Sequence, residues 1–232
     1  MKLHPKSEKN GFTLMEMLFT LNIVAAILAT LIPFLRRAYG HSDRLGCVNN
    51  LKQDALAFRP WGQDHFDKFP SAVSATNEGA MEAAWRGDLA AVFQVMSNEL
   101  NTPRILCCPV DRSRTWATNF SEGFSKSNIS YFVSLDATET NPAAFLLGDA
   151  NLTGPLRTGD HIFEMRLAET NYGWDASRHV QGYKRQILGY RYGPIGCGNA
   201  AFCDGSVQTL DSAQLGQAWL QSRMATNRLL MP

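Results

Sequence analysis

The sequence predicts an α+β fold, in which a long N-terminal α-helix that includes a membrane-spanning part precedes a globular head with an antiparallel β-sheet and short helices. Three observations support this prediction. Apolar residues are concentrated in one run near the N-terminus, helical spacing of apolar residues continues beyond that run, and the second half contains short β-forming runs between turn residues. The length of 232 residues suits one domain joined to an extended element.

Composition limits the classes of partner and of chemistry. The formal net charge is +1, whereas dedicated nucleic-acid binders usually carry a basic excess, so no nucleic acid is expected as a partner. The five histidines form no HExxH pattern, and neither a GxSxG motif nor a P-loop is present. We therefore expect no enzymatic activity.

The N-terminal region changes character at Phe12. Residues 1–11 are polar and contain three lysines against a single glutamate. Residues 12–35 contain one charge, Glu16, and residues 17–35 contain none. That uncharged stretch is close to the about 20 apolar residues that cross a bilayer as a helix. Two arginines follow it.

Four interpretations compete for this apolar run. A cleaved secretory signal should end in a small-x-small site, and none occurs before residue 40. The run is too long and too apolar for a buried helix of a soluble protein. A plain signal anchor explains the hydrophobicity but leaves Glu16 without a role, although a carboxylate within a membrane-spanning helix is costly and is by default a functional residue.

The fourth interpretation rests on the stretch GFTLME at residues 11–16. It resembles the prepilin peptidase motif of type IV pilins and type II secretion pseudopilins. The resemblance implies cleavage after Gly11, N-methylation of the new N-terminal residue Phe12, and a role in assembly for Glu16. In that family this carboxylate is thought to pair with the N-terminal amine of a neighbouring subunit, which would relieve the cost of an unpaired charge in an apolar core.

This resemblance implies a division of the chain into a leader peptide (1–11), a spine helix (12–58, of which 12–35 is transmembrane) and a periplasmic globular head (59–232). The leader lysines place the N-terminus in the cytoplasm and the head outside, as the positive-inside rule requires. We therefore expect a single-pass protein of the inner membrane. The implied partners are other pseudopilin subunits, prepilin peptidase, an inner-membrane assembly platform and membrane lipid.

Helical spacing continues through residues 38–58, and Pro60 is expected to end the long helix at about Phe58. Residues 78–100 carry apolar side chains three and four apart and predict one amphipathic helix. A closing helix is predicted at residues 212–224, with Ser212 as its N-cap.

The β-strands are predicted from short runs of β-branched, aromatic and other apolar residues. An Asp-Gly pair at 204–205 predicts a hairpin between two of these runs. The predicted strands are 129–135, 144–147, 190–192, 199–203 and 206–210.

The wider sequence also resembles a large pseudopilin-like family. Residues 47–53 match its C-x-N-N-L-K-Q signature, and residues 204–207 match its DGSV motif. One departure is Pro194, which stands where this family often has a histidine, so any role of that histidine is absent here.

Five cysteines leave at least one thiol outside any intramolecular set of disulfides. Cys47 lies at the end of the predicted long helix, and Cys108 lies beside a proline after the second helix. We predict that these two pair outside the cytoplasm, where disulfides persist. Cys197 and Cys203 are a less favoured pair, because they are close enough in sequence to meet only across a turn.

Residues 149–160 match the spacing of a calcium-binding EF-hand loop. Asp149, Asn151 and Thr153 occupy positions 1, 3 and 5, a glycine occupies position 6, and Asp160 occupies position 12. Thr153 and Asp160 depart from the usual ligands, and an arginine occupies position 9. Calcium is the candidate cofactor, and the alternative is a polar turn between strands. No other cofactor is expected.

Together these observations predict a structural subunit of a type II secretion pseudopilus or a type IV pilus-like fibre, assembled through its N-terminal helix. The alternative is a membrane-anchored periplasmic ligand-binding module that does not polymerise. Glu16 distinguishes the two, because assembly requires its carboxylate and anchoring does not.

Overall fold

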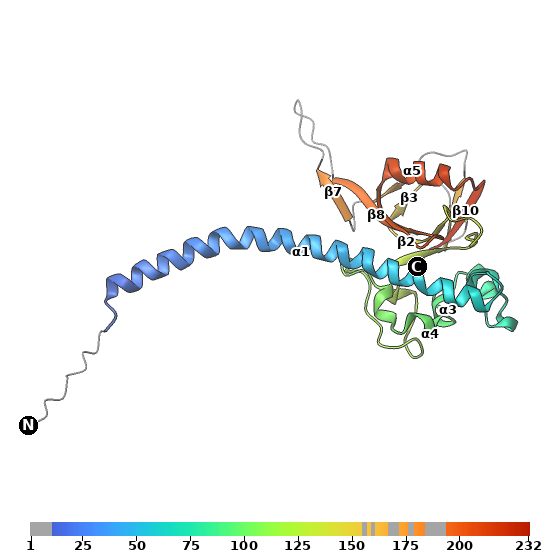
Figure 1. The fold of residues 1–232 in the computed structure, drawn as a ribbon, viewed down its shortest axis with the longest axis horizontal. Helices are drawn as coiled ribbons and strands as arrows, with labels where there is room; N and C mark the ends of the chain where they lie inside the picture. Colours follow the sequence, from blue (N-terminus) through green and yellow to red (C-terminus); the bar gives the residue numbers. More distant parts are fainter. Residues whose placement is uncertain (1–10, 155–156, 159–160, 167–171, 176–178, 184–193) are drawn as a thin grey trace, which may run out of the picture. The chain divides into compact units, whose positions relative to one another are not determined.

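The computed structural model describes residues 11–154, 157–158, 161–166, 172–175, 179–183 and 194–232. The predicted α+β class is confirmed: one long helix precedes short helices and an antiparallel sheet (Figure 1). The chain divides into two compact units, one ending at Ser42 and the other beginning at Asp43.

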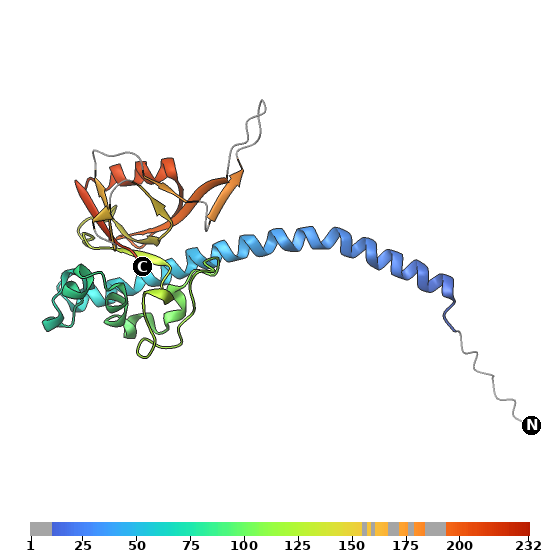
Figure 2. The same cartoon turned by 180° about the vertical axis from the view of Figure 1, so that it is seen from behind.

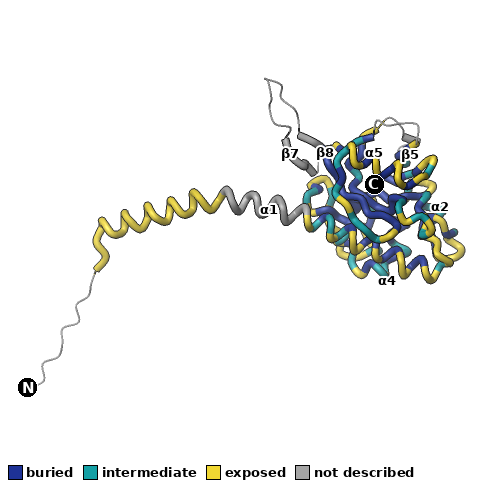
Figure 3. Tube along the Cα trace, turned by 45° about the horizontal axis from the view of Figure 1, so that its top comes forward, coloured by how far each residue is buried: buried dark blue, intermediate teal, exposed yellow. Residues whose placement is uncertain are grey.

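Helix α1 runs from Leu14 to Asp64, a length of 51 residues. Its first part, Leu14–Ile32, has a mean hydropathy of 2.0 and is long and apolar enough to cross a membrane, by length and composition. Every side chain of this stretch is exposed (Figure 3). The stretch Leu14–Ile32 therefore offers apolar helix surface in all directions.

The expected end of the long helix at Phe58 is wrong, because α1 continues through Pro60 to Asp64. An internal proline costs a helix roughly 3 kcal/mol. Burial of an apolar side chain stabilises by a comparable amount, about 1.5–3 kcal/mol. Trp61 is buried, and its ring stacks on His65 with the ring centroids 3.7 Å apart. Tertiary packing thus offsets the local cost of the proline.

The single helix expected at residues 78–100 is also wrong. The chain forms three short helices there, α2 (Met81–Trp85), α3 (Leu89–Gln94) and α4 (Ser97–Leu100). Gly87 has a φ of +91°, which breaks the helix, and the Asp88 side chain then caps α3 by accepting from the Ala91 amide at 3.2 Å. Most of the apolar stripe is still buried, at Ala84, Leu89, Val92, Phe93 and Met96, whereas Met81 is half-buried and Trp85 is exposed.

Four 3₁₀ turns complete the helical part of the described chain. They are η1 (Pro70–Ala72), η2 (Ala75–Asn77), η3 (Pro103–Leu106) and η4 (Lys126–Asn128).

The strands pair antiparallel throughout the described residues. The main sheet has the order β4-β5-β10-β1-β2-β8-β7, with β9 also paired to β8, and β3 pairs with β6 in a separate two-stranded sheet. The strands are β1 (Tyr131–Ser134), β2 (Phe145–Asp149), β3 (Leu152–Thr153), β4 (Arg157–Thr158), β5 (Ile162–Arg166), β6 (Gly173–Trp174), β7 (His179–Tyr183), β8 (Pro194–Phe202), β9 (Val207–Asp211) and β10 (Thr226–Leu230).

Most of the predicted strands correspond to observed ones. Strands β1 and β2 occupy the runs predicted at 129–135 and 144–147. The hairpin predicted around Asp-Gly is formed by β8 and β9, with Ala201 opposite Val207 and Gly205 at a φ of +83°. The strand predicted at 190–192 lies outside the described residues.

The closing helix is α5, Ser212–Gln221, but its N-cap is Asp211 and not Ser212. Asp211 Oδ1 accepts from the amides of Ala213 and Gln214 at 2.9 and 2.8 Å, and Gln214 Oε1 accepts from the Asp211 amide. This D-x-x-Q arrangement is a capping box. The Ser212 hydroxyl instead accepts from the Trp174 amide at 3.0 Å, which ties α5 to β6.

Alternate side chains of the central strands serve two cores, because successive residues of a strand point to opposite faces. Tyr131 and Val133 pack with the second half of α1 and the short helices, whereas Phe132 packs with Leu215 and Trp219 of α5. Figure 1 shows α5 on one side of the sheet and the short helices α3 and α4 on the other, and Figure 2 shows the same arrangement from behind.

Candidate functional site

Gly11 and Phe12 lie just before the first turn of α1. Residues 11–13 are not helical, and the Phe12 side chain is 76% exposed. Apart from Gly11 itself and its two chain neighbours, no described residue has a heavy atom within 4 Å of the place where a Cβ on Gly11 would stand. The peptide bond that the resemblance marks for cleavage is therefore uncovered by the described residues around it.

Glu16 takes part in a capping box at the start of α1. Its Oε2 accepts from the Thr13 amide at 2.9 Å and from the Thr13 hydroxyl at 2.8 Å, and the Glu16 amide donates to Thr13 Oγ1 at 3.3 Å. This reciprocal arrangement satisfies amide groups that a helix start leaves unpaired. The carboxylate thus has a structural role within its own chain.

The sequence reasoning missed this role of Glu16. The pattern Thr-x-x-Glu immediately before an apolar run, here Thr13 to Glu16, indicates a capping box and could have revealed it. The consequence for function is practical. Removing the whole side chain of Glu16 removes a helix cap together with a charge, so the two effects need separate variants.

The polar side chains within the apolar part of α1 bond to their own helix. Thr20 Oγ1 donates to the Met17 carbonyl at 2.9 Å, and Asn22 Nδ2 donates to the Leu18 carbonyl at 2.8 Å. Thr30 Oγ1 likewise donates to a carbonyl of the preceding turn at 2.9 Å. Such internal hydrogen bonds lower the cost of placing these groups in apolar surroundings.

The large exposed surface of this stretch is apolar. A contiguous apolar surface of this kind marks contact with a membrane or a protein. Its exposed large side chains are Leu14, Met15, Met17, Leu18, Phe19, Leu21, Ile23, Val24, Ile27, Leu28, Leu31 and Ile32.

The structure joins Cys47 and Cys108 by a disulfide, the pair expected from the sequence. The bond connects buried positions 61 residues apart, one in α1 and one after η3, with the Cα atoms 5.1 Å apart. It closes a long loop and ties the short helices to α1. Cys197 and Cys203 are both buried and are not joined to each other.

The residues expected to bind calcium hold the head together by hydrogen bonds. Asp149 Oδ2 accepts from the amide and the side-chain nitrogen of Asn199 at 2.7 and 2.9 Å. Asn151 donates to the Asp175 carbonyl at 2.7 Å, and Thr153 donates to the Gly173 carbonyl at 3.2 Å. In the described part of the chain, no group of three or more His, Cys, Asp or Glu side chains could hold a metal ion.

The local fold around these residues differs from an EF-hand. Strand β2 ends at Asp149 and β5 begins at Ile162, so strands lie where an EF-hand has its flanking helices, and β3 lies within the loop itself. Asp160 lies outside the described residues. Calcium binding by this stretch stays a prediction.

A buried carboxyl group was not anticipated from the sequence. Asp54 is fully buried on α1, and neither of its oxygens has a hydrogen-bond partner among the described residues. Burial raises the pKa of Asp54 well above its ordinary value. Its position three residues after Leu51 and four before Phe58, both core residues, is the pattern that could have revealed it.

Asp54 acts electrostatically on the sheet. Burial, followed by the charges of Asp149 and Asp54, raises the pKa of Tyr131 well above its ordinary value. The interior between α1 and β1 is therefore a place where ionisation is suppressed.

Compared with protein-family models, curated proteins and solved structures, the chain matches none of them.

Proposed function

We propose that this chain is a pseudopilin, a structural subunit of a type II secretion pseudopilus or a type IV pilus-like fibre. In this proposal prepilin peptidase cleaves between Gly11 and Phe12, and the subunits assemble through the apolar part of α1. The observation that supports it most is a helix surface that is apolar in every direction over Leu14–Ile32 and carries one carboxylate, in its first turn.

The apolar helix has two successive environments in this proposal. Before assembly it lies in the inner membrane, with the head in the periplasm, because its length and composition suit a bilayer. During assembly the same surface packs against the helices of other subunits in the fibre core, with the assembly platform drawing it from the lipid. One and the same helix surface suits both environments, because lipid tails and apolar side chains are similarly apolar.

Cleavage would create an amine at Phe12 close to the first turn of α1. In a fibre core, the Glu16 carboxylate of one subunit can pair with the Phe12 amine of its neighbour. Removing one member of a buried ion pair costs about 3–5 kcal/mol, because the remaining charge is then uncompensated. The pair would therefore select one register between neighbouring subunits.

The capping box determines which variants test this pairing. Glu16→Gln keeps an oxygen that can accept from the Thr13 amide but loses the charge. Thr13→Val loses the hydroxyl cap but keeps the carboxylate. At equal membrane levels, the yield of sheared fibres or crosslinked oligomers should fall by roughly tenfold or more for Glu16→Gln, consistent with loss of a buried pair.

Thr13→Val should assemble nearly as well as the wild type. If Glu16→Gln assembles normally and Thr13→Val does not, the carboxylate serves only as a cap and the assembly proposal fails.

Processing is tested independently of assembly. After co-expression with prepilin peptidase, intact-mass analysis should find a chain that begins with methylated Phe12. Gly11→Ala should be the best tolerated change at the cleavage site, whereas Gly11→Leu should block cleavage. Because no heavy atom crowds Gly11 within the described chain, a block reflects recognition by the peptidase and not misfolding. A mature protein that retains Met1 would contradict the proposal.

The alternative is a membrane-anchored ligand-binding module that does not polymerise. One observation favours it, a cavity in the head next to the end of α1. This alternative would be supported if the wild type formed no fibres and Glu16→Gln still folded, inserted into the membrane and bound ligand normally.

A further inference from the structure

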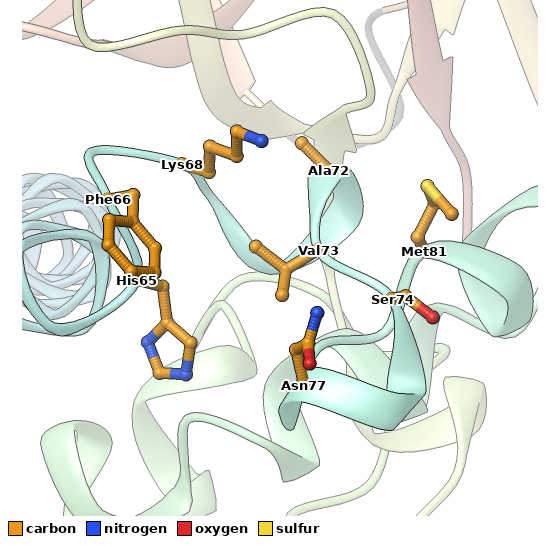
Figure 4. Close-up of a pocket in the computed structure, with 8 residues that line it drawn as sticks. All are labelled: His65, Phe66, Lys68, Ala72, Val73, Ser74, Asn77 and Met81. Atoms are coloured by element: carbon orange, nitrogen blue, oxygen red, sulfur yellow. The ribbon is translucent and has the colours of Figure 1, made fainter.

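A cavity of about 470 Å³ lies where α1 ends and the chain passes through η1 and η2 into α2 (Figure 4). Sites for small molecules typically have volumes of about 300–1,000 Å³, with largely apolar walls and a few polar groups. This cavity, called here the η1–η2 cavity, has both kinds of lining. All of its lining residues belong to the head.

The apolar lining includes an aromatic side chain that is not part of the hydrophobic core. Phe66 is 93% exposed, and Val73 and Met81 line the cavity with it. Phe66 has a φ of +59°, which a bulky side chain rarely adopts, and the next residue, Asp67, has a φ of +57°. Strained backbone of this kind is often found at ligand sites, where the surrounding structure holds it in place.

The strained turn is held by the end of α1. The amides of His65 and Asp67 both donate to the Gly62 carbonyl at 2.9 Å. Trp61 is buried and stacks on His65. The position of Phe66 at the cavity is therefore a consequence of the fold and not of an isolated loop.

The polar lining offers hydrogen-bond donors and one positive charge, the ammonium group of Lys68. Lys68 and Asn77 both line the cavity, with Val73 between them in the view of Figure 4. Within the described residues, neither the Lys68 ammonium nor the Asn77 amide group has a hydrogen-bond or ion-pair partner, and no acidic side chain lines the cavity. The nearby carboxylate of Glu82 is already engaged, because it accepts from the Ser74 hydroxyl at 2.5 Å and the Ala75 amide at 2.9 Å.

We propose that the η1–η2 cavity binds a small carboxylate that has an apolar body. The carboxylate would accept from the Lys68 ammonium and the Asn77 amide, and the apolar body would lie against Phe66, Val73 and Met81. Charge complementarity selects an anion, and the apolar lining selects an anion with a hydrocarbon or aromatic part. The proposal does not depend on fibre assembly.

The test measures ligand binding to the full chain in lipid nanodiscs by isothermal titration calorimetry. Empty nanodiscs are the blank, because the ligands can also partition into the lipid. The probes are 3-phenylpropionate and 4-phenylbutyrate, and the control ligand is 3-phenylpropanamide, which has a similar shape but no charge. A hydrogen bond to a charged group contributes enough to make the carboxylates bind roughly tenfold or more tightly than the amide.

Three variants localise the binding. Lys68→Met removes the charge and should weaken binding of the carboxylates to the level of the amide, whereas Lys68→Arg should retain it. Ala72→Phe, at an exposed position that lines the cavity, should obstruct both carboxylates and amide. Lys126→Met is the matched control, because Lys126 is an exposed lysine that does not line the cavity.

Equal affinities for 3-phenylpropionate and its amide would overturn the proposal, and this comparison needs no variant to fold. A loss at Lys126→Met equal to that at Lys68→Met would also overturn it, as would the absence of binding of both carboxylate probes at millimolar concentration.

Discussion

Helix α1 contains two stretches that use apolar residues in different ways. In Leu14–Ile32 the apolar side chains point in every direction, and all of them are exposed. Between Cys47 and Trp61 the buried residues recur three and four positions apart, with exposed residues such as Lys52 and Arg59 between them. The first stretch leaves its apolar side chains exposed in the described chain, whereas the second packs its apolar side chains in the core of the head.

This difference shows how periodicity separates the two roles. A helix with one apolar stripe packs against its own domain, whereas a helix that is apolar all round is buried in a membrane or among other helices. The same secondary structure therefore contributes to the core of the head at one end and presents an exposed apolar surface at the other. Matched substitutions at the two ends should separate these roles.

The largest expected effect comes from a pair of phenylalanines in the two stretches. Phe58 is fully buried and packs edge-to-face against Phe69 and Phe93, with ring centroids 5.6 and 6.4 Å away. Phe58→Ala should lower the free energy of unfolding of the head by about 3–5 kcal/mol. Phe19→Ala, at an exposed position, should leave it unchanged within about 0.5 kcal/mol.

Denaturant titration followed by tryptophan fluorescence measures both variants in detergent. Equal losses for Phe19→Ala and Phe58→Ala would show that the comparison between the two stretches is mistaken.

The disulfide should have the next largest effect. A double variant, Cys47→Ala with Cys108→Ala, releases the constraint on a 61-residue separation and should lower the free energy of unfolding of the head by about 2–4 kcal/mol. Wild-type protein unfolded under reducing conditions is the control and should lose a similar amount. An unchanged denaturation midpoint in the double variant would mean that the bond does not stabilise the head.

A smaller, pH-dependent effect is expected from the buried carboxyl of Asp54. The pKa of Asp54 is raised in the folded protein, so the native state binds the proton more tightly than the unfolded chain does. Asp54 therefore destabilises the head progressively as the pH rises above the ordinary pKa of an aspartate. Asp54→Asn should therefore unfold at higher denaturant concentration than wild type at pH 8, with the gain disappearing towards pH 4.

Asp64→Asn is the matched control in the same helix, since Asp64 is exposed. A gain for Asp54→Asn that is the same at both pH values would show that ionisation of Asp54 is not the cause.

The smallest expected effect comes from two helix caps of similar chemistry. Asp211→Ala removes the N-cap of α5 and should lower the free energy of unfolding of the head by about 1 kcal/mol. Thr13→Ala removes the cap of α1 and should lower the helicity of its first turn by circular dichroism without changing the unfolding of the head. A loss of head stability from Thr13→Ala would contradict the separation of roles along α1.

Much of the fold could be predicted from local sequence patterns. The Asp-Gly hairpin between β8 and β9 depends on two residues whose backbone preferences are strong. The strands β1 and β2 are continuous β-forming runs, and their burial on both faces follows from that continuity. Short strands such as β3 and β6, with two residues each, carry too little local pattern to be recognised.

Helix boundaries were predicted less well because several interactions compete at each end. Pro60 was expected to stop α1, but packing of Trp61 carries the helix four residues further. The apolar stripe of residues 78–100 correctly indicated burial but not continuity, since Gly87 and the cap at Asp88 divide it. At Pro60 a local signal was outweighed by packing, and at Gly87 a local signal was missed.

The sequence by itself determined the character of the N-terminal stretch, because hydrophobicity, length and a single charge are properties of the residues and need no partner within the chain. The same is true of the capping box between Thr13 and Glu16, which involves residues three apart. Only the tertiary structure decided which residues of distant segments meet. The burial of Asp54, the alternation of Tyr131 and Phe132 between two cores, and the cavity beside Phe66 all depend on side chains brought together from different elements.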